Sequence, residues 1–154
     1  MRNFAIRLMA YEAGETEPSE TNPPTGFYVC EKLRRHLATF MGHTGFHTLL
    51  ARALALAGGE VPWLRGVRLE ADGSLPGLEK IPEDLDPDEL FEGGVVLLAQ
   101  LLGLLVAFIG ENLTVRLVRE VWPKVPLNNL DFGNPGKNGH ERKKEREGKN
   151  DKTR

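Results

Sequence analysis

GGVVLLAQLLGLLVAFIG, residues 93–110, is the longest apolar segment of the chain. It carries no charge, its one polar side chain is Gln100, and Glu92 and Glu111 flank it. A segment of this kind is either a membrane span or a helix that other parts of the protein surround on all sides. The fold class depends on which of the two it is.

The length of the segment favours a buried helix. Val95–Ile109 comprises 15 residues, or about 22 Å of helix, whereas the core of a bilayer is about 30 Å thick. A span would also place the amide of Gln100 in lipid, where it lacks a hydrogen-bond partner. Acidic residues before the segment and basic residues after it nevertheless fit a span whose C-terminus is cytosolic. A single-span membrane protein, with its span near 93–110 and a cytosolic C-terminal helix, therefore stays open as an alternative.

The motif LDPDEL, residues 85–90, marks the start of the helix that contains this segment. Asp86 is placed to cap the helix, Pro87 suits the first helical position, and Glu89 can complete a capping box. The two leucines of the motif occupy the positions of a hydrophobic staple. The sequence therefore predicts that a helix begins at Pro87.

The apolar spacing continues beyond the end of the segment. From Leu105 to Val121 apolar residues recur in steps of four without a change of phase. This spacing predicts one helix over 87–122, with Gly110 as the place of a kink. Pro123 ends it because proline cannot continue a helix.

Two further helices precede this one in the chain. Apolar residues at helical spacing predict a helix over 25–41 and another over 44–57. Gly42 separates them, and a pair of glycines follows the second. Because the join is short, the two helices should form an αα-hairpin. Residues 2–13 fit a short amphipathic helix, with a strand as the alternative.

These elements predict an all-α, mainly helical fold: a small bundle of about four helices around a central hydrophobic helix. Near residues 60–82 the helical spacing is absent, and a loop or a short β-hairpin is expected there. A chain of this length suits one domain, which we place at residues 1–132, with a mobile loop over 12–25. Residues 133–154 are polar and charged, and they predict a disordered tail.

Charge and cysteine content exclude several classes of partner. Residues 136–154 carry eight basic and four acidic side chains, and the rest of the chain carries 12 basic and 18 acidic ones. Such an acidic body repels phosphate, so no nucleic-acid partner is expected. A lone cysteine gives no disulfide, and Arg7 interrupts the apolar run that a secretory signal needs. A cytoplasmic protein is predicted.

Motifs for catalysis or cofactor binding are weak in this sequence. It has no glycine-rich phosphate loop with its lysine and no serine in a nucleophile elbow. His43 and His47 stand four residues apart and could share a metal ion, but no third ligand is evident. Cys30 falls on an apolar helical face, as a buried structural cysteine does. No cofactor is predicted and an enzyme is disfavoured, while a metal-binding protein or enzyme that uses His43 and His47 stays open as an alternative.

Small residues suggest how the central helix is covered. Ala99, Gly103 and Ala107 form a stripe of small residues at spacing four. A similar stripe, Ala51, Ala55 and Gly59, lies on the helix over 44–57 and just after its end. We expect these two stripes to pack together, because small residues let helix backbones approach closely. If part of the apolar surface of the central helix stays uncovered, we expect a second copy of the protein to cover it. The predicted homodimer interface consists of Ala99, Gly103, Leu105 and Ala107.

The function predicted from these features is protein–protein interaction. Apolar helical surface is present and the motifs of catalysis are missing. We therefore expect a non-enzymatic regulatory or adaptor module that self-associates through its apolar helix and binds a protein partner of unknown identity.

Overall fold

The structure is a computed structural model and describes residues 1–15, 25–71, 74–75, 81–82 and 84–125. Its described parts are helical, as predicted, and contain no strand. In chain order the elements are α1 (Arg2–Glu15), α2 (Thr25–Gly58), the 3-10 helix η1 (Pro62–Gly66), α3 (Pro87–Ile109) and α4 (Glu111–Val121).

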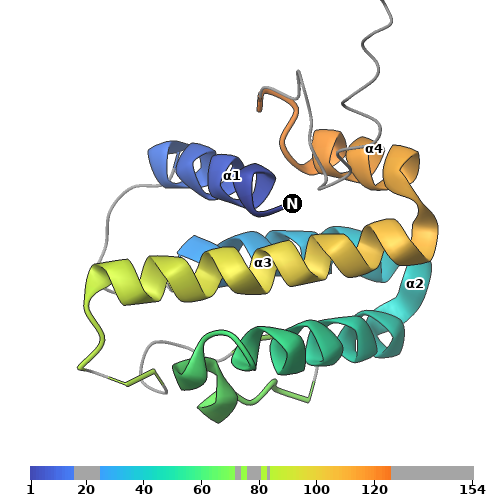
Figure 1. Cartoon of the computed structure of the whole chain (residues 1–154). Helices are drawn as coiled ribbons and strands as arrows, with labels where there is room; N and C mark the ends of the chain where they lie inside the picture. The colour runs from blue at the N-terminus through green and yellow to red at the C-terminus, as the bar shows by residue number, and fades with distance from the viewer. Residues whose placement is uncertain (16–24, 72–73, 76–80, 83, 126–154) are drawn as a thin grey trace, which may run out of the picture.

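Helix α3 is the centre of the bundle, which confirms the predicted central hydrophobic helix. Figure 1 shows α3 crossing the middle of the molecule, with α1 and α4 on one side of it and both parts of α2 behind and below. Its buried side chains include Val95, Leu98, Leu101 and Leu102. The amide of Gln100 lies at the edge of this core, where its Nε2 donates to Oε2 of Glu60 over 2.9 Å.

Helix α2 folds back on itself at Gly42. This glycine has φ 79° and ψ 161° within an otherwise helical element, a conformation that glycine adopts without steric cost. Figure 1 shows the part before it running behind α3 and the part after it running back below α3. The predicted αα-hairpin with its join at Gly42 is confirmed.

The single helix predicted over 87–122 is wrong. Gly110 adopts φ 93° and ψ 159° and separates α3 from α4, and Figure 1 shows α4 folded back beside α3. The hydroxyl of Thr114 donates to the carbonyl oxygen of Gly110 over 2.8 Å and satisfies an acceptor at the turn. The spacing of four continues across the turn because each helix separately buries an apolar face; in α4 this face includes Leu117 and Val118.

The start of α3 has the predicted capping box. The backbone N–H of Glu89 donates to Oδ1 of Asp86 over 2.8 Å, and the backbone N–H of Asp86 donates to Oε1 of Glu89 over 3.1 Å. Pro87 is the first residue of the helix. Leu85 and Leu90 are both partly buried against the core, as a hydrophobic staple requires.

Between α2 and α3 the described residues contain no strand, so among them the loop alternative of the prediction holds. They include η1, and beyond it the N–H of Glu70 donates to the carbonyl oxygen of Ser74 over 2.8 Å. Residues 12–15, assigned to a loop by the sequence, continue α1. The rest of that predicted loop up to residue 24, and the predicted tail 133–154, lie outside the described residues.

Candidate functional site

The structure divides the four predicted interface residues between the core and the surface. Leu105 is only 1% exposed and belongs to the core of the single chain. Ala99 and Gly103 are partly buried, and Ala107 is exposed. A second copy could therefore reach Gly103 and Ala107 directly, whereas Leu105 can support such a surface only from beneath.

Gly103 leaves the backbone of α3 uncovered. A Cβ atom added to this glycine would meet no atom within 4 Å outside its own helix. Gly103 is thus open on its outer side, and nothing in the described part of the chain fills the position above it. This opening is what a close helix–helix contact with another molecule would need.

Two large apolar side chains near the turn at Gly110 are exposed to solvent. Phe108, near the end of α3, is 71% exposed, and Leu113, in the first turn of α4, is 38% exposed. We call Gly103, Ala107, Phe108 and Leu113 the apolar corner, since they lie on either side of the turn at Gly110. Exposed apolar residues mark a candidate interface where they form one patch.

The predicted packing of one small-residue stripe on the other is wrong. Ala51, Ala55 and Gly59 are exposed, and the alanines that α2 buries are Ala53 and Ala57. The buried face of this part of α2 includes the large side chains Phe46 and Leu50, and alanines in step with them turn inward. Spacing alone marked both sets of small residues and could not choose between them.

The close approach of α2 and α3 occurs instead at Gly26 and Gly94. A Cβ atom added to Gly94 would lie 3.0 Å from the Cα of Gly26 and 2.8 Å from the Cε of Met9. Real Cβ atoms are rarely this close to a backbone, so both glycines are required for the helices to cross here. The sequence analysis missed this contact because the two glycines are far apart in the chain.

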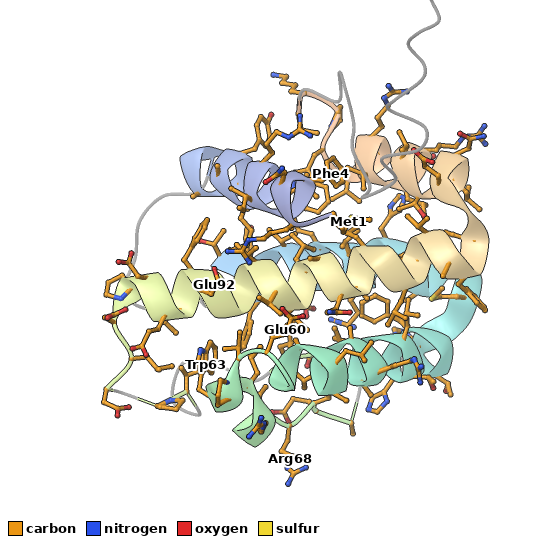
Figure 2. All side chains as sticks on the ribbon, in the orientation of Figure 1. Met1, Phe4, Glu60, Trp63, Arg68 and Glu92 are labelled. Carbon is orange, nitrogen blue, oxygen red and sulfur yellow. The ribbon has the colours of Figure 1, made fainter. Side chains whose placement is uncertain are left out.

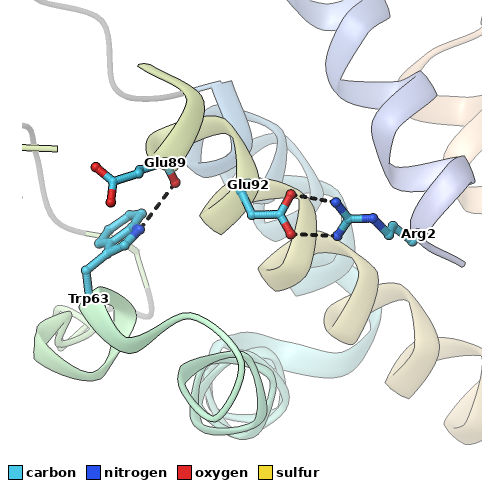
Figure 3. Close-up of polar contacts among 4 residues, drawn as sticks. All are labelled: Arg2, Trp63, Glu89 and Glu92. Atoms are coloured by element: carbon cyan, nitrogen blue, oxygen red, sulfur yellow. Dashed lines mark hydrogen bonds and ion pairs between the residues drawn. The ribbon is translucent and has the colours of Figure 1, made fainter. Parts of the chain in front are cut away.

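Trp63 fixes η1 to the start of α3. Its indole Nε1 donates to the carbonyl oxygen of Glu89 over 3.3 Å, as Figure 3 shows. A Cβ atom added to Gly93 would lie 2.9 Å from Cε2 of this indole, and the ring of Phe27 packs at a tilted angle with its centroid 6.3 Å away. Around Gly93 the chain itself therefore covers α3, although Phe91, two residues earlier, is 40% exposed.

Arg2 and Glu92 form a two-point ion pair between α1 and α3. The two guanidinium nitrogens lie 2.8 and 2.5 Å from the two carboxylate oxygens (Figure 3). The hydrogen bond from Arg2 lowers the pKa of Glu92, and the same bond raises the pKa of Arg2. Both side chains are about half exposed, so the pair orients α1 more than it stabilises the fold.

A buried carboxylate joins α1, α2 and the end of α4. Glu12 is 1% exposed, and its Oε1 accepts from Nε1 of Trp122 over 2.8 Å and from Nζ of Lys32 over 2.9 Å. Glu12 follows Leu8 by four residues, so helical spacing alone would have placed this acid on the buried face of α1. The sequence analysis overlooked it.

The candidate residues for chemistry are His43, His47 and Cys30, all in α2. His43 is exposed and His47 partly buried, and within the described residues no three His, Cys, Asp or Glu side chains are grouped to hold a metal ion. Cys30 is fully buried, and burial raises the pKa of its thiol to about 12. The thiol therefore stays protonated at neutral pH and is a poor nucleophile, which agrees with the predicted structural role.

Comparison of the chain with protein-family models, with curated proteins and with solved structures found no match. The apolar corner is therefore judged on its own geometry.

Proposed function

We propose that the protein is a non-enzymatic, cytoplasmic interaction module that forms a homodimer through the apolar corner. The observation that carries the proposal is the exposure of Phe108 near the end of α3. At 71% it is the most exposed large apolar side chain among the described residues, whereas Phe91, near the start of the same helix, is 40% exposed. A regulatory or adaptor role follows if the dimer presents a combined surface to a protein partner.

The corner is suited to a symmetric contact with a second copy. A two-fold interface uses the same patch on both molecules, so the patch must complement itself. Here the open position at Gly103 and the exposed Ala107 lie four residues apart, on one face of α3. In an antiparallel pair of α3 helices these small residues let the two backbones approach closely, and the ring of Phe108 can be buried at the edge of the contact. Burying one such ring stabilises a contact by about 1.5–3 kcal/mol.

A membrane span is the competing explanation for the same helix. α3 is the one helix among the described residues that is long and apolar enough to cross a bilayer. Half of its most apolar 18-residue window is buried inside the chain, however, against neighbouring helices. Inserting α3 into lipid would expose those core contacts, so the packed arrangement supports the interaction module.

Substitution of Gly103 tests the proposal without disturbing the fold. Since the added side chain meets open space in the single chain, Gly103→Leu should leave the monomer intact and overpack the dimer contact. Overpacking costs about 1–3 kcal/mol, so the dissociation constant of the dimer should rise about tenfold or more. Analytical ultracentrifugation over a dilution series measures this constant.

Gly14→Leu is the matched control. Gly14 is also helical and also open on its outer side, but it lies in α1, away from the corner in the sequence. We expect its dimer to have the same dissociation constant as the wild type. A Gly103→Leu protein whose dimer is equally tight would remove the corner as the interface.

A further inference from the structure

A second surface feature lies on α2 and the segment that follows it. It is a hollow of about 430 Å³ between the second part of α2 and residues 64–69. Leu54, Leu64 and Val67 are among the residues that line it, and all three are buried in the core. The exposed stripe residues Ala51 and Ala55 form its wall. The small side chains of that stripe thus leave room for a ligand rather than for a neighbouring helix.

The charges around this hollow are of one sign. Three of its lining residues, His47, Arg65 and Arg68, are basic, and none of the described lining residues is acidic. The chain as a whole has a net negative charge, so the basic lining of the hollow has the opposite sign to the net charge of the chain. An apolar floor beneath basic side chains complements a molecule with an apolar body and an anionic head.

Arg65 is held in place at the rim. Its Nε donates to the carbonyl oxygen of Gly58 over 2.8 Å, and its Cγ would lie 3.2 Å from a Cβ atom added to Gly58. The side chain therefore lies across the end of α2, and this bond uses one of its five N–H donors. A guanidinium fixed in this way can present its remaining donors to a carboxylate in a planar, two-point arrangement.

Arg68 supplies a second, more adaptable cation. Figure 2 shows it extending away from the ribbon of the segment after η1, and it makes no ion pair with the described residues. Because it is exposed and lines the hollow, it can turn toward a head group without breaking an existing contact.

We propose that this hollow binds a single-chain amphiphile with a carboxylate head, such as a medium-chain fatty acid. The alkyl chain lies on Leu54, Leu64 and Val67, and the carboxylate lies between Arg65 and Arg68. The volume is in the range of small-molecule sites, about 300–1,000 Å³, and this favours a small ligand over a folded partner. The site shares no residue with the apolar corner, so ligand binding at the hollow and formation of the homodimer can be tested independently.

Titration with decanoate below its micelle concentration tests the proposal. Isothermal calorimetry measures binding, and the fluorescence of the two tryptophans, one of which, Trp63, precedes Leu64 in η1, gives a second readout. Decanoate should bind at one site per chain. Butyrate, which lacks the long chain, and decyltrimethylammonium, which carries the opposite charge, should both bind at least about tenfold more weakly.

Two variants locate the site. Arg68→Gln removes a cation that has no ion pair among the described residues and should weaken decanoate binding about tenfold. Arg52→Gln changes an exposed arginine of α2 outside the hollow and should leave the binding unchanged. Ala55→Leu places a larger side chain on the wall and should weaken binding by displacing the alkyl chain. Circular dichroism of each variant verifies that the helices are intact.

Three results would contradict the proposed binding site. The first is no binding of decanoate by the wild type up to about 1 mM. The second is equal affinity for decanoate and decyltrimethylammonium, which is what detergent-like adsorption gives. The third is decanoate binding that Phe108→Ser abolishes and Ala55→Leu leaves unchanged, because this would place the amphiphile on the apolar corner.

Discussion

Gly26 of α2 and Gly94 of α3 touch backbone to backbone. A Cβ atom added to Gly26 would overlap the Cα of Gly94 and lie 3.1 Å from its carbonyl carbon. This crossing sets how closely the central helix packs against α2, the helix with which it makes its most extensive contact. The clashing atoms belong to the backbone, so a side chain cannot move aside to relieve them.

Gly26→Ala should therefore destabilise the fold although it adds only one methyl group. Overpacking of a rigid contact costs about 1–3 kcal/mol, more than the gain of up to about 1 kcal/mol that alanine gives over glycine within a helix. Urea denaturation followed by circular dichroism measures the free energy of unfolding. Gly14→Ala, at an open position of α1, should instead be neutral or slightly stabilising. Equal stability of the two variants would contradict the close crossing.

Gly93→Ala should clash with Trp63, and the two residues should be energetically coupled. The added methyl would lie 2.9 Å from Cε2 of the indole, so the ring must shift and weaken its hydrogen bond to Glu89. We expect a loss of about 1–2 kcal/mol in unfolding free energy and a change in tryptophan fluorescence. In a Trp63→Ala background, the same substitution should cost much less. Additive losses in this double-mutant cycle would show that the two residues do not touch.

Glu12→Gln should weaken the junction of α1, α2 and α4. The amide keeps an acceptor for Trp122 but loses the charge that pairs with Lys32. We expect a loss of about 1–3 kcal/mol in unfolding free energy, which is the usual effect of disturbing a buried polar contact. Glu120→Gln is a useful control, because that exposed carboxylate contacts His36 at the surface and should contribute little. A junction that tolerates Glu12→Gln as well as the control would not depend on the charge.

The ion pair of Arg2 and Glu92 should give a small, pH-dependent contribution to stability. Arg2 lowers the pKa of Glu92 in the folded state, so the pair stabilises the fold above the ordinary glutamate pKa of 4.5. This contribution is lost as the pH falls through the lowered folded-state value. Glu92→Gln should lower the unfolding free energy at pH 7 by less than about 1 kcal/mol, since both groups are exposed. A difference from wild type that persists at pH 2 would not come from this ion pair.

Local patterns predicted the helices and their starts because the chemistry lies within a few residues. Asp86 and Glu89 satisfy each other's backbone N–H groups, and Gly42 supplies a conformation that other residues avoid. Each of these features acts over one helical turn, so it is visible in the sequence.

Contacts between distant residues could not be predicted in the same way. The spacing of apolar residues is unchanged across Gly110, so it did not show that the backbone turns back there. The crossing of Gly26 and Gly94 depends on how two helices are placed in space. Within the candidate interface, the stripe indicated Gly103 and Ala107, but only the structure shows that Leu105 is buried and that Phe108 is exposed.

The state of the full-length protein in detergent-free buffer is the most direct test of the central claim, that α3 is packed within the chain and leaves a self-complementary corner. After high-speed centrifugation, light scattering gives the mass of the protein in the supernatant over a range of concentrations. We expect soluble protein whose mass rises to twice 17.1 kDa as the concentration increases. Protein that pellets with membranes and resists a carbonate wash, or a monomer at every concentration, would contradict it.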